Sequence, residues 1–297
     1  MNASIHLLRQ TVPAAVHLQV SVPPDHPSTF LGAERSGTGT VVDPSGIILT
    51  AHYLVIGAES IEVTFADGTT RPGELVALDF ASGLATIRVA AQDLAVASVH
   101  AGNDVEVGQD VFLISSVGDG LRVASGAVSS RAPFEAFWEY LLDDALTTTA
   151  TNPGVGGGPL LDKQGRLIGV VTLSLPEVGK FTLAIPSSYY LAQRSALCGQ
   201  STSGAATPRA WVGVTCYTLR NHVVIASLIP GSPAEAAGLR TGDVVLELDG
   251  CPISDRSALY RGFWRRQPGD PMRFRVFRNN GTVTIDVVAR SAEEFFG

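Results

Sequence analysis

The sequence has few cysteines, little charge and no long apolar run, and each shortage argues against a class of protein. Only 3 of its 297 residues are cysteines, widely spaced and without a CxxC pair or a nearby histidine, so we expect three unpaired thiols, no metal site and no cofactor. Charged residues make up 16% of the chain and the net charge is −7, with no basic face that would favour nucleic acid or an anionic membrane. Because no run of about 18 apolar residues occurs, we expect no membrane span.

The first residues, "MNASIHLLRQTVPAAVHLQVSV", lack the uninterrupted apolar core of a secretory signal. An upstream signal or anchor that has been removed would escape this test. The compartment is therefore left open at this point.

The abundant residues point to compact β structure. Hydrophobic residues make up 45% of the chain, and 31 glycines and 17 prolines supply turns. From Val16 to about Ile185, short runs rich in Val, Ile, Thr and Leu alternate with Gly, Pro and Asp turns, which predicts an all-β barrel pattern. A length of 297 residues suits two domains with separate cores.

Helical signals and a shift in composition divide the chain further. "FEAFWEYLLDDA" fits a helix or a loop with an apolar plug, whereas "SSYYLAQRSALC" has helical spacing and a serine that could cap it. "SPAEAAG" and "SDRSALYRGFWRRQPG" predict two helices in a small α+β module. We expect a first domain over 1–198, a linker over 199–209, a second domain over 210–291 and a loose tail over 292–297.

Several segments, in order along nearly the whole chain, resemble the HtrA family of serine proteases. "SGTGTVVDPSGIILTAHYLVIGA" is similar to the family's entry to the active-site histidine, "LDFASGLATIRV" to the aspartate segment, and "NPGVGGGPLLDKQGRLIGVVT" to the serine loop. "SLIPGSPAEAAGLRTGDVVLELDGCPI" is very close to the PDZ module that follows these protease domains. The resemblance implies a mostly β fold, a chymotrypsin/trypsin-like double β-barrel followed by a small α+β PDZ domain.

The catalytic positions implied by this resemblance are degenerate. The histidine position falls on Tyr53, the aspartate position on Gly83 and the serine position on Gly156. Acyl transfer by a triad needs a nucleophile, a base to accept its proton and an acid that orients the base. We therefore expect a pseudoprotease, a chain that is not an enzyme.

Two alternatives involve residues beside these positions. His52 lies one residue early, and such an offset normally turns a side chain away from the site. The glycine-rich "GVGGG" could cradle a phosphate, but strand, turn and strand follow it instead of the helix that such a site requires. The loop is better interpreted as a remnant of an oxyanion pocket, formed by Gly154, Val155 and Gly156.

The second domain retains the residues that binding a peptide C-terminus requires. Such a peptide offers its carboxylate to backbone N–H groups and adds a strand to a free sheet edge. "WVGVTCYT" resembles the carboxylate-binding loop, and "SALYRGFW" the facing wall, in which Leu259, Phe263 and Tyr260 are either ligand-facing or core residues. The predicted peptide-binding residues are Trp211, Val212, Gly213, Val214, Thr215, Leu259 and Phe263.

Three functions remain open from the sequence. A catalytically inactive HtrA-like scaffold that binds peptides or protein C-termini is the first, a structural subunit completing an oligomer with an active homologue is the second, and a hydrolase with a rearranged site is the third. Family analogy also implies a possible homotrimer, for which Phe30 and Leu31 are apolar candidates in a polar lead-in, and an extracytoplasmic location if a signal was removed.

Overall fold

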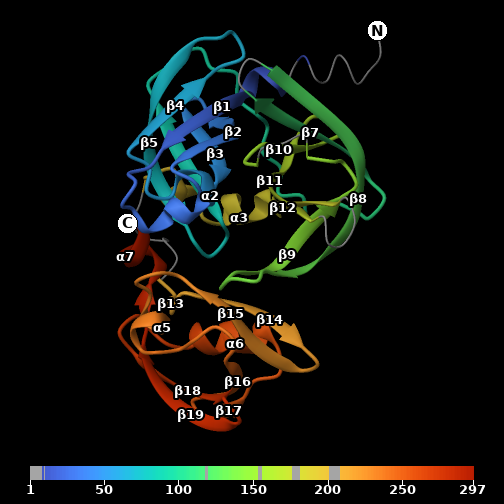
Figure 1. The fold of residues 1–297 in the computed structure, drawn as a ribbon. Coiled ribbons are helices and arrows are strands. Elements are labelled where there is room, and N and C mark those ends of the chain that lie inside the picture. The colour runs from blue at the N-terminus through green and yellow to red at the C-terminus, as the bar shows by residue number, and fades with distance from the viewer. Residues whose placement is uncertain (1–8, 10, 118–119, 153–155, 176–180, 201–207) are drawn as a thin grey trace. The chain divides into compact units, whose positions relative to one another are not determined.

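The computed structural model describes residues 9, 11–117, 120–152, 156–175, 181–200 and 208–297 (Figure 1). The chain divides into two compact units whose boundary does not follow the sequence order. The first unit comprises residues 1–133 and 143–205, and the second comprises residues 134–142 and 206–297. A short internal segment therefore belongs with the C-terminal unit.

The first unit begins with a closed six-stranded barrel whose strand order is β1-β2-β3-β6-β5-β4 (Figure 1). Val16, Leu18 and Val20 on β1 are almost completely buried, because alternate residues of a strand face the same side, here the barrel core. The elements of this barrel are η1 (Val12–Ala14), β1 (Ala15–Ser21), η2 (Pro27–Leu31), β2 (Glu34–Asp43), β3 (Ile47–Ala51), α2 (His52–Val55), β4 (Ser60–Thr64), β5 (Thr70–Asp79) and β6 (Leu84–Val89).

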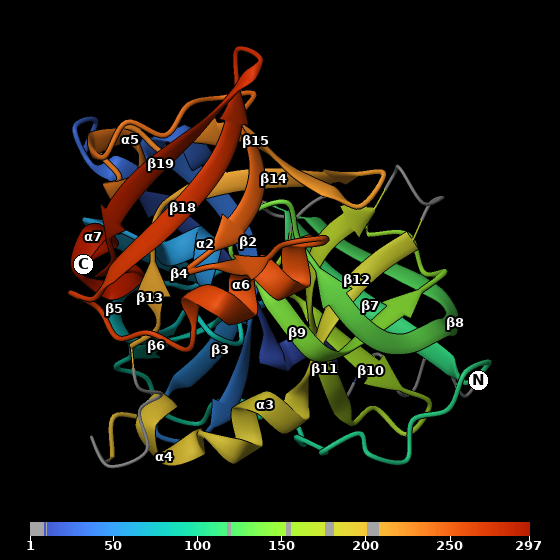
Figure 2. The same ribbon diagram turned by 90° about the horizontal axis from the view of Figure 1, so that it is seen from below.

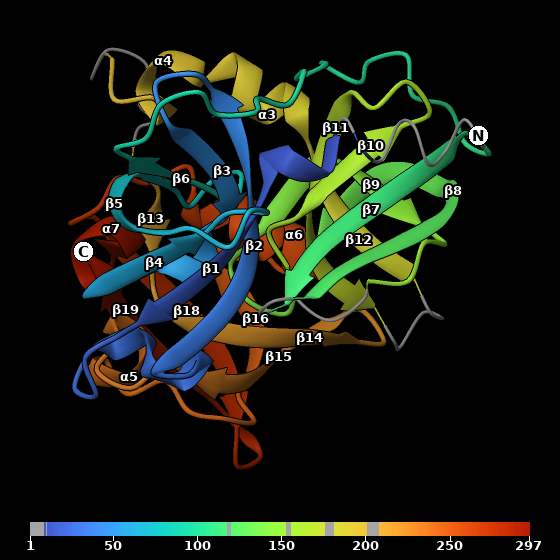
Figure 3. The ribbon, with the colours of Figure 1, turned by 90° about the horizontal axis from the view of Figure 1, so that it is seen from above.

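A second closed barrel follows, with the order β10-β11-β12-β9-β8-β7, and Figure 3 shows its long antiparallel β7–β8 pair. Leu113, Leu146 and Ile168 lie in its core. Its elements are β7 (Asp110–Val117), β8 (Gly120–Glu135), β9 (Leu141–Thr148), β10 (Pro159–Asp162), β11 (Leu167–Leu175), β12 (Phe181–Pro186), α3 (Ser187–Ala192) and α4 (Arg194–Leu197).

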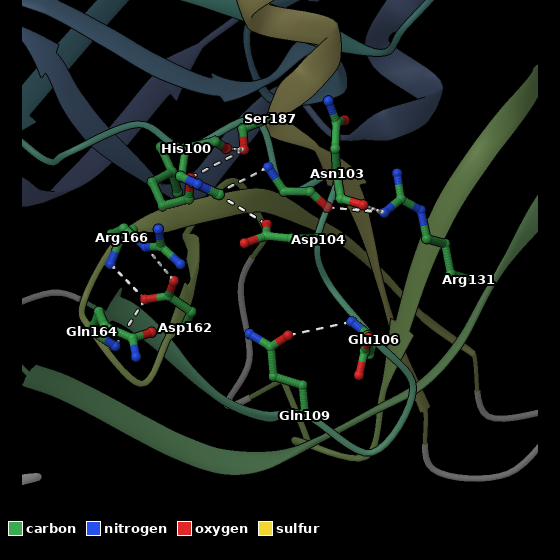
Figure 4. Close-up of polar contacts among 12 residues, drawn as sticks. His100, Asn103, Asp104, Glu106, Gln109, Arg131, Asp162, Gln164, Arg166 and Ser187 are labelled. Atoms are coloured by element: carbon green, nitrogen blue, oxygen red, sulfur yellow. Dashed lines mark hydrogen bonds and ion pairs between the residues drawn. The ribbon is translucent and has the colours of Figure 1, made fainter.

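Polar contacts tie the connection between the barrels to the second barrel (Figure 4). Arg131 on β8 donates to the carbonyl oxygens of Gly102 and Asn103 at 2.9 and 3.3 Å. The fully buried Asp162 carboxylate accepts from the Arg166 side chain at 2.6 Å, which compensates the burial of its charge. These contacts explain local structure, and in the described ranges no group of three or more His, Cys, Asp or Glu could hold a metal ion.

The second unit contains an antiparallel sheet of order β14-β15-β16-β18-β19, in which β14 is an edge strand, together with helix α6 (Figure 2). Asp255 caps α6 by accepting the Ala258 N–H at 2.7 Å, and Ser232 caps α5 in the same way through Glu235 N–H. The elements are β13 (Ala210–Trp211), β14 (Val214–Leu219), β15 (His222–Leu228), α5 (Pro233–Ala236), β16 (Val244–Leu248), β17 (Cys251–Pro252), α6 (Arg256–Phe263), β18 (Pro271–Arg278), β19 (Gly281–Val288), β20 (Arg290–Ser291) and α7 (Ala292–Phe296).

The predicted fold class is confirmed, since two six-stranded barrels precede a small α+β domain. Three local expectations differ. "FEAFWEYLLDDA" is not helical, because β8 runs to Glu135 and β9 begins at Leu141. "SSYYLAQRSALC" forms two short helices, and the Ser187 hydroxyl donates to the Leu167 carbonyl oxygen instead of capping the first of them.

The third difference is the C-terminus, where we expected a loose tail. Residues 292–296 form α7, capped by Ser291, and the rings of Phe295 and Phe296 lie 4.7 and 5.4 Å from the Trp211 ring between centroids. The aromatic contacts give these residues a packing partner that the linear sequence does not show. Among the helices of the described ranges, none combines the length and the apolar character needed to cross a lipid bilayer.

Candidate functional site

The first unit brings two of the three predicted catalytic positions together. Tyr53 lies on α2, and its hydroxyl donates to the carbonyl oxygen of Thr172 on β11 at 3.1 Å. A Cβ built on Gly156 would overlap this hydroxyl oxygen, so the tyrosine occupies the space that any side chain at position 156 would need. Gly156 itself accepts the Thr38 N–H at 2.9 Å. Gly154 and Val155, the other members of the predicted oxyanion remnant, lie outside the described residues.

The third position, Gly83, is adjacent to His52 instead. The Nδ1 and backbone N–H of His52 each lie 2.9 Å from the Gly83 carbonyl oxygen, which can only accept, so Nδ1 carries the proton. The imidazole packs edge-on to Phe80 with a centroid distance of 5.6 Å. His52 as a whole keeps some exposure, but burial of its ring lowers its pKa to about 4, and burial raises the pKa of Tyr53 to about 12. Both side chains are therefore neutral at pH 7.

An acid and a serine lie in the turn that ends at Gly83. The Ser82 hydroxyl donates to the Asp79 carboxylate, which also accepts from the Ala81 N–H and from the Gln193 amide, each at 3.0 Å. Ser82 is only 1% exposed. This serine therefore supports the turn, and its hydroxyl is not presented to a substrate.

The predicted carboxylate-binding loop of the second unit binds a carboxylate that the chain itself supplies. Oε1 of Glu139 accepts the backbone N–H groups of Gly213 and Val214 at 2.6 and 2.9 Å, and Oε2 accepts that of Val212 at 3.1 Å. Gly213 has φ +86°, and a Cβ there would overlap the Ser232 side chain, so only glycine fits this turn without strain. Three consecutive N–H groups thus converge on one anion, as in a backbone nest.

The segment that carries Glu139 also lies along the free edge of β14. The Cys216 N–H donates to the Phe137 carbonyl oxygen at 2.5 Å, and Trp138 pairs with Thr215 as an antiparallel bridge. From α6, the Tyr260 hydroxyl donates to the same Phe137 oxygen at 2.9 Å. The edge of β14 therefore accepts added backbone by strand pairing, the interaction predicted for a bound peptide.

Charge around the groove is arranged in two separate groups. Burial of the Glu139 carboxylate raises its pKa to about 7, although the three N–H donors act in the opposite direction. Its stem remains partly exposed, so the cost of burial falls on the carboxylate end. Arg256 on α6 is bonded to Glu135 at 2.7 Å and stacks over the Phe137 ring. Glu139 is thus held by backbone dipoles and not by an ion pair.

The predicted peptide-binding residues fall into two sets. Val212, Gly213 and Val214 bind the carboxylate through their N–H groups, Thr215 pairs with the segment, and Trp211 packs behind the loop against α7. Leu259 and Phe263 are fully buried members of the domain core. Their role as a wall that selects ligand side chains stays a prediction.

Sequence reasoning missed Glu139 and Arg256, and it gave Tyr260 only a subordinate place. The available signal was the aromatic stretch "FEAFWEYLL" between two strands, which we interpreted as a helix or plug. Phe137 and Trp138 are 47% and 38% exposed, which neither a barrel core nor an ordinary polar loop would show. No linear spacing links this stretch to a loop more than 70 residues away.

Comparison with known proteins agrees with both domains. The family model described as trypsin-like peptidase domain matches residues 37–170, and the PDZ domain model matches residues 210–288. A probable periplasmic serine endoprotease, DegP-like, from Halomonas elongata is 30% identical over 90% of this chain and 60% of its own length. A putative serine protease, HhoA, from Synechocystis is 31% identical over 76% of this chain and 63% of its own. The chain thus spans about three fifths of these relatives.

Solved structures show the same fold. The HtrA-type protease AlgW with a tripeptide has a TM-score of 0.59 and 24% identity, with 96% of each chain covered. The serine endoprotease from Yersinia pestis has a TM-score of 0.59 and 21% identity, with 98% of each chain covered.

The relatives contradict the prediction that this chain is not an enzyme. They are named serine endoproteases or serine proteases, and they match the chain through its trypsin-like domain, so the prediction is wrong on this comparison. It rested on Tyr53, Gly83 and Gly156 alone. Those positions are insufficient for the conclusion, because backbone amides and substrate binding supply catalysis of their own when triad residues are absent.

Proposed function

Because this chain combines a trypsin-like domain of the HtrA family with a PDZ domain, we propose that it binds protein or peptide C-termini in the groove between β14 and α6. The observation that supports this proposal is the convergence of the Val212, Gly213 and Val214 N–H groups on a single carboxylate. A terminal carboxylate presents the same two oxygens. The peptide backbone would then pair with β14, the free edge of the sheet.

Side-chain preference would come from the residues around the paired strand. Tyr260 and Arg256 on α6 contact the residues beside β14, while Leu259 and Phe263 on the same helix are buried in the apolar core. We therefore expect ligands with apolar residues near the C-terminus and modest affinity, since few residues are buried and the free peptide must be ordered.

The test uses the full-length chain and matched peptides. Fluorescein-labelled octapeptides with a free C-terminal carboxylate are titrated beside the same peptides as C-terminal amides. Acids should bind several-fold more tightly than amides, and equal binding would refute the proposal. Mass spectrometry of the same mixtures reports whether bound peptide is cleaved, which measures on this chain the activity named for its relatives.

Oligomerisation is a second proposal, supported by the exposure of two apolar residues on η2. Phe30 is 59% exposed and Leu31 is 40% exposed. We propose that they contribute to a homotrimer contact, which would remove both side chains from water. A monomeric mass by light scattering over micromolar concentrations would refute this. The names of the periplasmic relatives support an extracytoplasmic location, which cell fractionation tests.

A further inference from the structure

Residues 134–142 of the chain occupy the proposed peptide-binding groove of the second unit, and they make the contacts that a bound peptide would make. Three interactions define peptide capture in such a groove: a carboxylate on the loop N–H groups, backbone pairing with the edge strand and contacts to the facing helix. Residues 134–142 make all three through Glu139, Phe137 and Trp138, within the same compact unit.

Residues 134–142 make specific contacts near the start, the centre and the end of the segment. Glu135 pairs with Arg256 on α6 at 2.7 Å. The Tyr260 hydroxyl donates to the Phe137 carbonyl oxygen, and the Tyr140 ring stacks on Trp138 with an interplanar angle of 13°. Ala136 and Tyr140 are buried, at 2% and 5% exposure. A polar side chain, the backbone and aromatic rings therefore fix one register.

We infer that residues 134–142 are a built-in ligand of this groove, with the Glu139 side chain in the place of a peptide's terminal carboxylate, and that external C-termini bind by displacing it. The inference rests on the proposed peptide-binding function. Both carboxylates need the same three N–H groups, so they cannot be bound together.

Residues 134–142 compete favourably with an external peptide because they are covalently connected to the groove. Residues 134–142 continue directly into β8 and β9, so they cannot diffuse away when released. Tethered ligands have effective concentrations on the order of millimolar, far above ordinary concentrations of a free partner. An external peptide of modest affinity therefore displaces residues 134–142 only at high concentration, or when a multivalent partner raises its effective concentration.

The substitution that isolates this contact is Glu139→Ala, with Glu139→Gln as an isosteric partner and Asp286→Ala as a matched control. Alanine removes the acceptor, whereas glutamine keeps an oxygen for the N–H groups without the charge. Asp286 pairs with Arg273 on β18 and β19, remote from β14 in the strand order of the sheet. Circular dichroism and thermal melting check that each full-length variant is folded.

The probe is a pool of fluorescein-labelled octapeptides with random residues and a C-terminal valine as free acid. We expect Glu139→Ala to bind the pool roughly tenfold or more tightly than wild type, with Glu139→Gln binding it no more tightly than wild type and Asp286→Ala equal to wild type. If wild type and Glu139→Ala bind the pool equally well, the groove is not self-occupied and the inference is wrong, while the proposed function stands.

If no variant binds the pool, the proposed function fails, and amide hydrogen exchange then judges the inference directly. The Val212, Gly213 and Val214 N–H groups should exchange slowly in wild type and faster by roughly tenfold or more in Glu139→Ala, because a bonded amide must open before it exchanges. Equal exchange in the two proteins would overturn the inference.

Discussion

The occupied groove should respond to pH, because Glu139 is buried where backbone dipoles and not a cation hold it. Its pKa is about 7 in the bound position, compared with 4.5 for an ordinary glutamate. We call the form in which residues 134–142 occupy the groove the closed form, and the form in which they are released the open form. The closed form therefore binds the Glu139 proton more tightly than the open form. Closure should be strongest below pH 4.5 and should weaken as the pH rises to about 7.

The size of the effect follows from linkage. Each pH unit within this window is worth about 1.4 kcal/mol, so closure should lose about 3 kcal/mol between pH 4.5 and 7. The other groups around the carboxylate do not reverse this sign. Arg256 is paired with Glu135, and burial raises the pKa of Cys216 to about 12 and that of Tyr260 further, so both stay neutral in this range.

The measurement is the affinity of the valine-terminated acid pool, by fluorescence anisotropy, from pH 5 to pH 8. The peptide carboxylate is ionised throughout this range, since its pKa lies near ~3.5. Wild type should bind more tightly as the pH rises, by up to roughly tenfold per unit until most molecules are open. Glu139→Gln should show a flat profile. A wild-type affinity that is constant or falls with pH, or an equal slope in Glu139→Gln, would refute the reasoning.

Three further predictions concern the stability of each domain and the oligomeric state. Gly156→Ser should lower the free energy of unfolding by about 1–3 kcal/mol, because its Cβ would overlap the Tyr53 hydroxyl, and adding Tyr53→His should recover most of the loss; additive effects in urea denaturation would contradict this coupling. Ser232→Ala should cost about 1 kcal/mol through the lost cap of α5, measured by thermal unfolding against Ser257→Ala on α6, which removes no cap. Phe30→Ser should lower the mass found by light scattering if η2 lies in a subunit contact, and an unchanged oligomer mass would exclude that role.

Local sequence pattern was sufficient for much of the fold. Alternating apolar residues and Gly or Asp turns predicted the strands of both barrels, because strand periodicity and turn chemistry are properties of neighbouring residues. The same holds for the cap of α5 and for the "WVGV" loop, where a glycine with positive φ between apolar residues marks a turn that exposes its N–H groups.

Other features depend on residues that are distant in the chain. The sequence placed glycine at 156 and tyrosine at 53, but only the folded barrels show that the tyrosine hydroxyl fills the space above the glycine. The loose tail became α7 because Trp211, 84 or more residues earlier, offers its ring to Phe295 and Phe296.

The sequence by itself determined which groups could bind a carboxylate, since a loop of the form found at 211–214 presents its amides whatever ligand arrives. Tertiary structure alone decided which carboxylate is bound. Glu139 reaches the loop through a turn between β8 and β9 that has no periodic pattern of its own, and its contacts are made across more than 70 residues. The pairing of Glu139 with this loop depends on how the folded chain brings the two segments together and on how well a carboxylate fits three N–H groups. Neither property can be recognised from residues that are neighbours in the sequence.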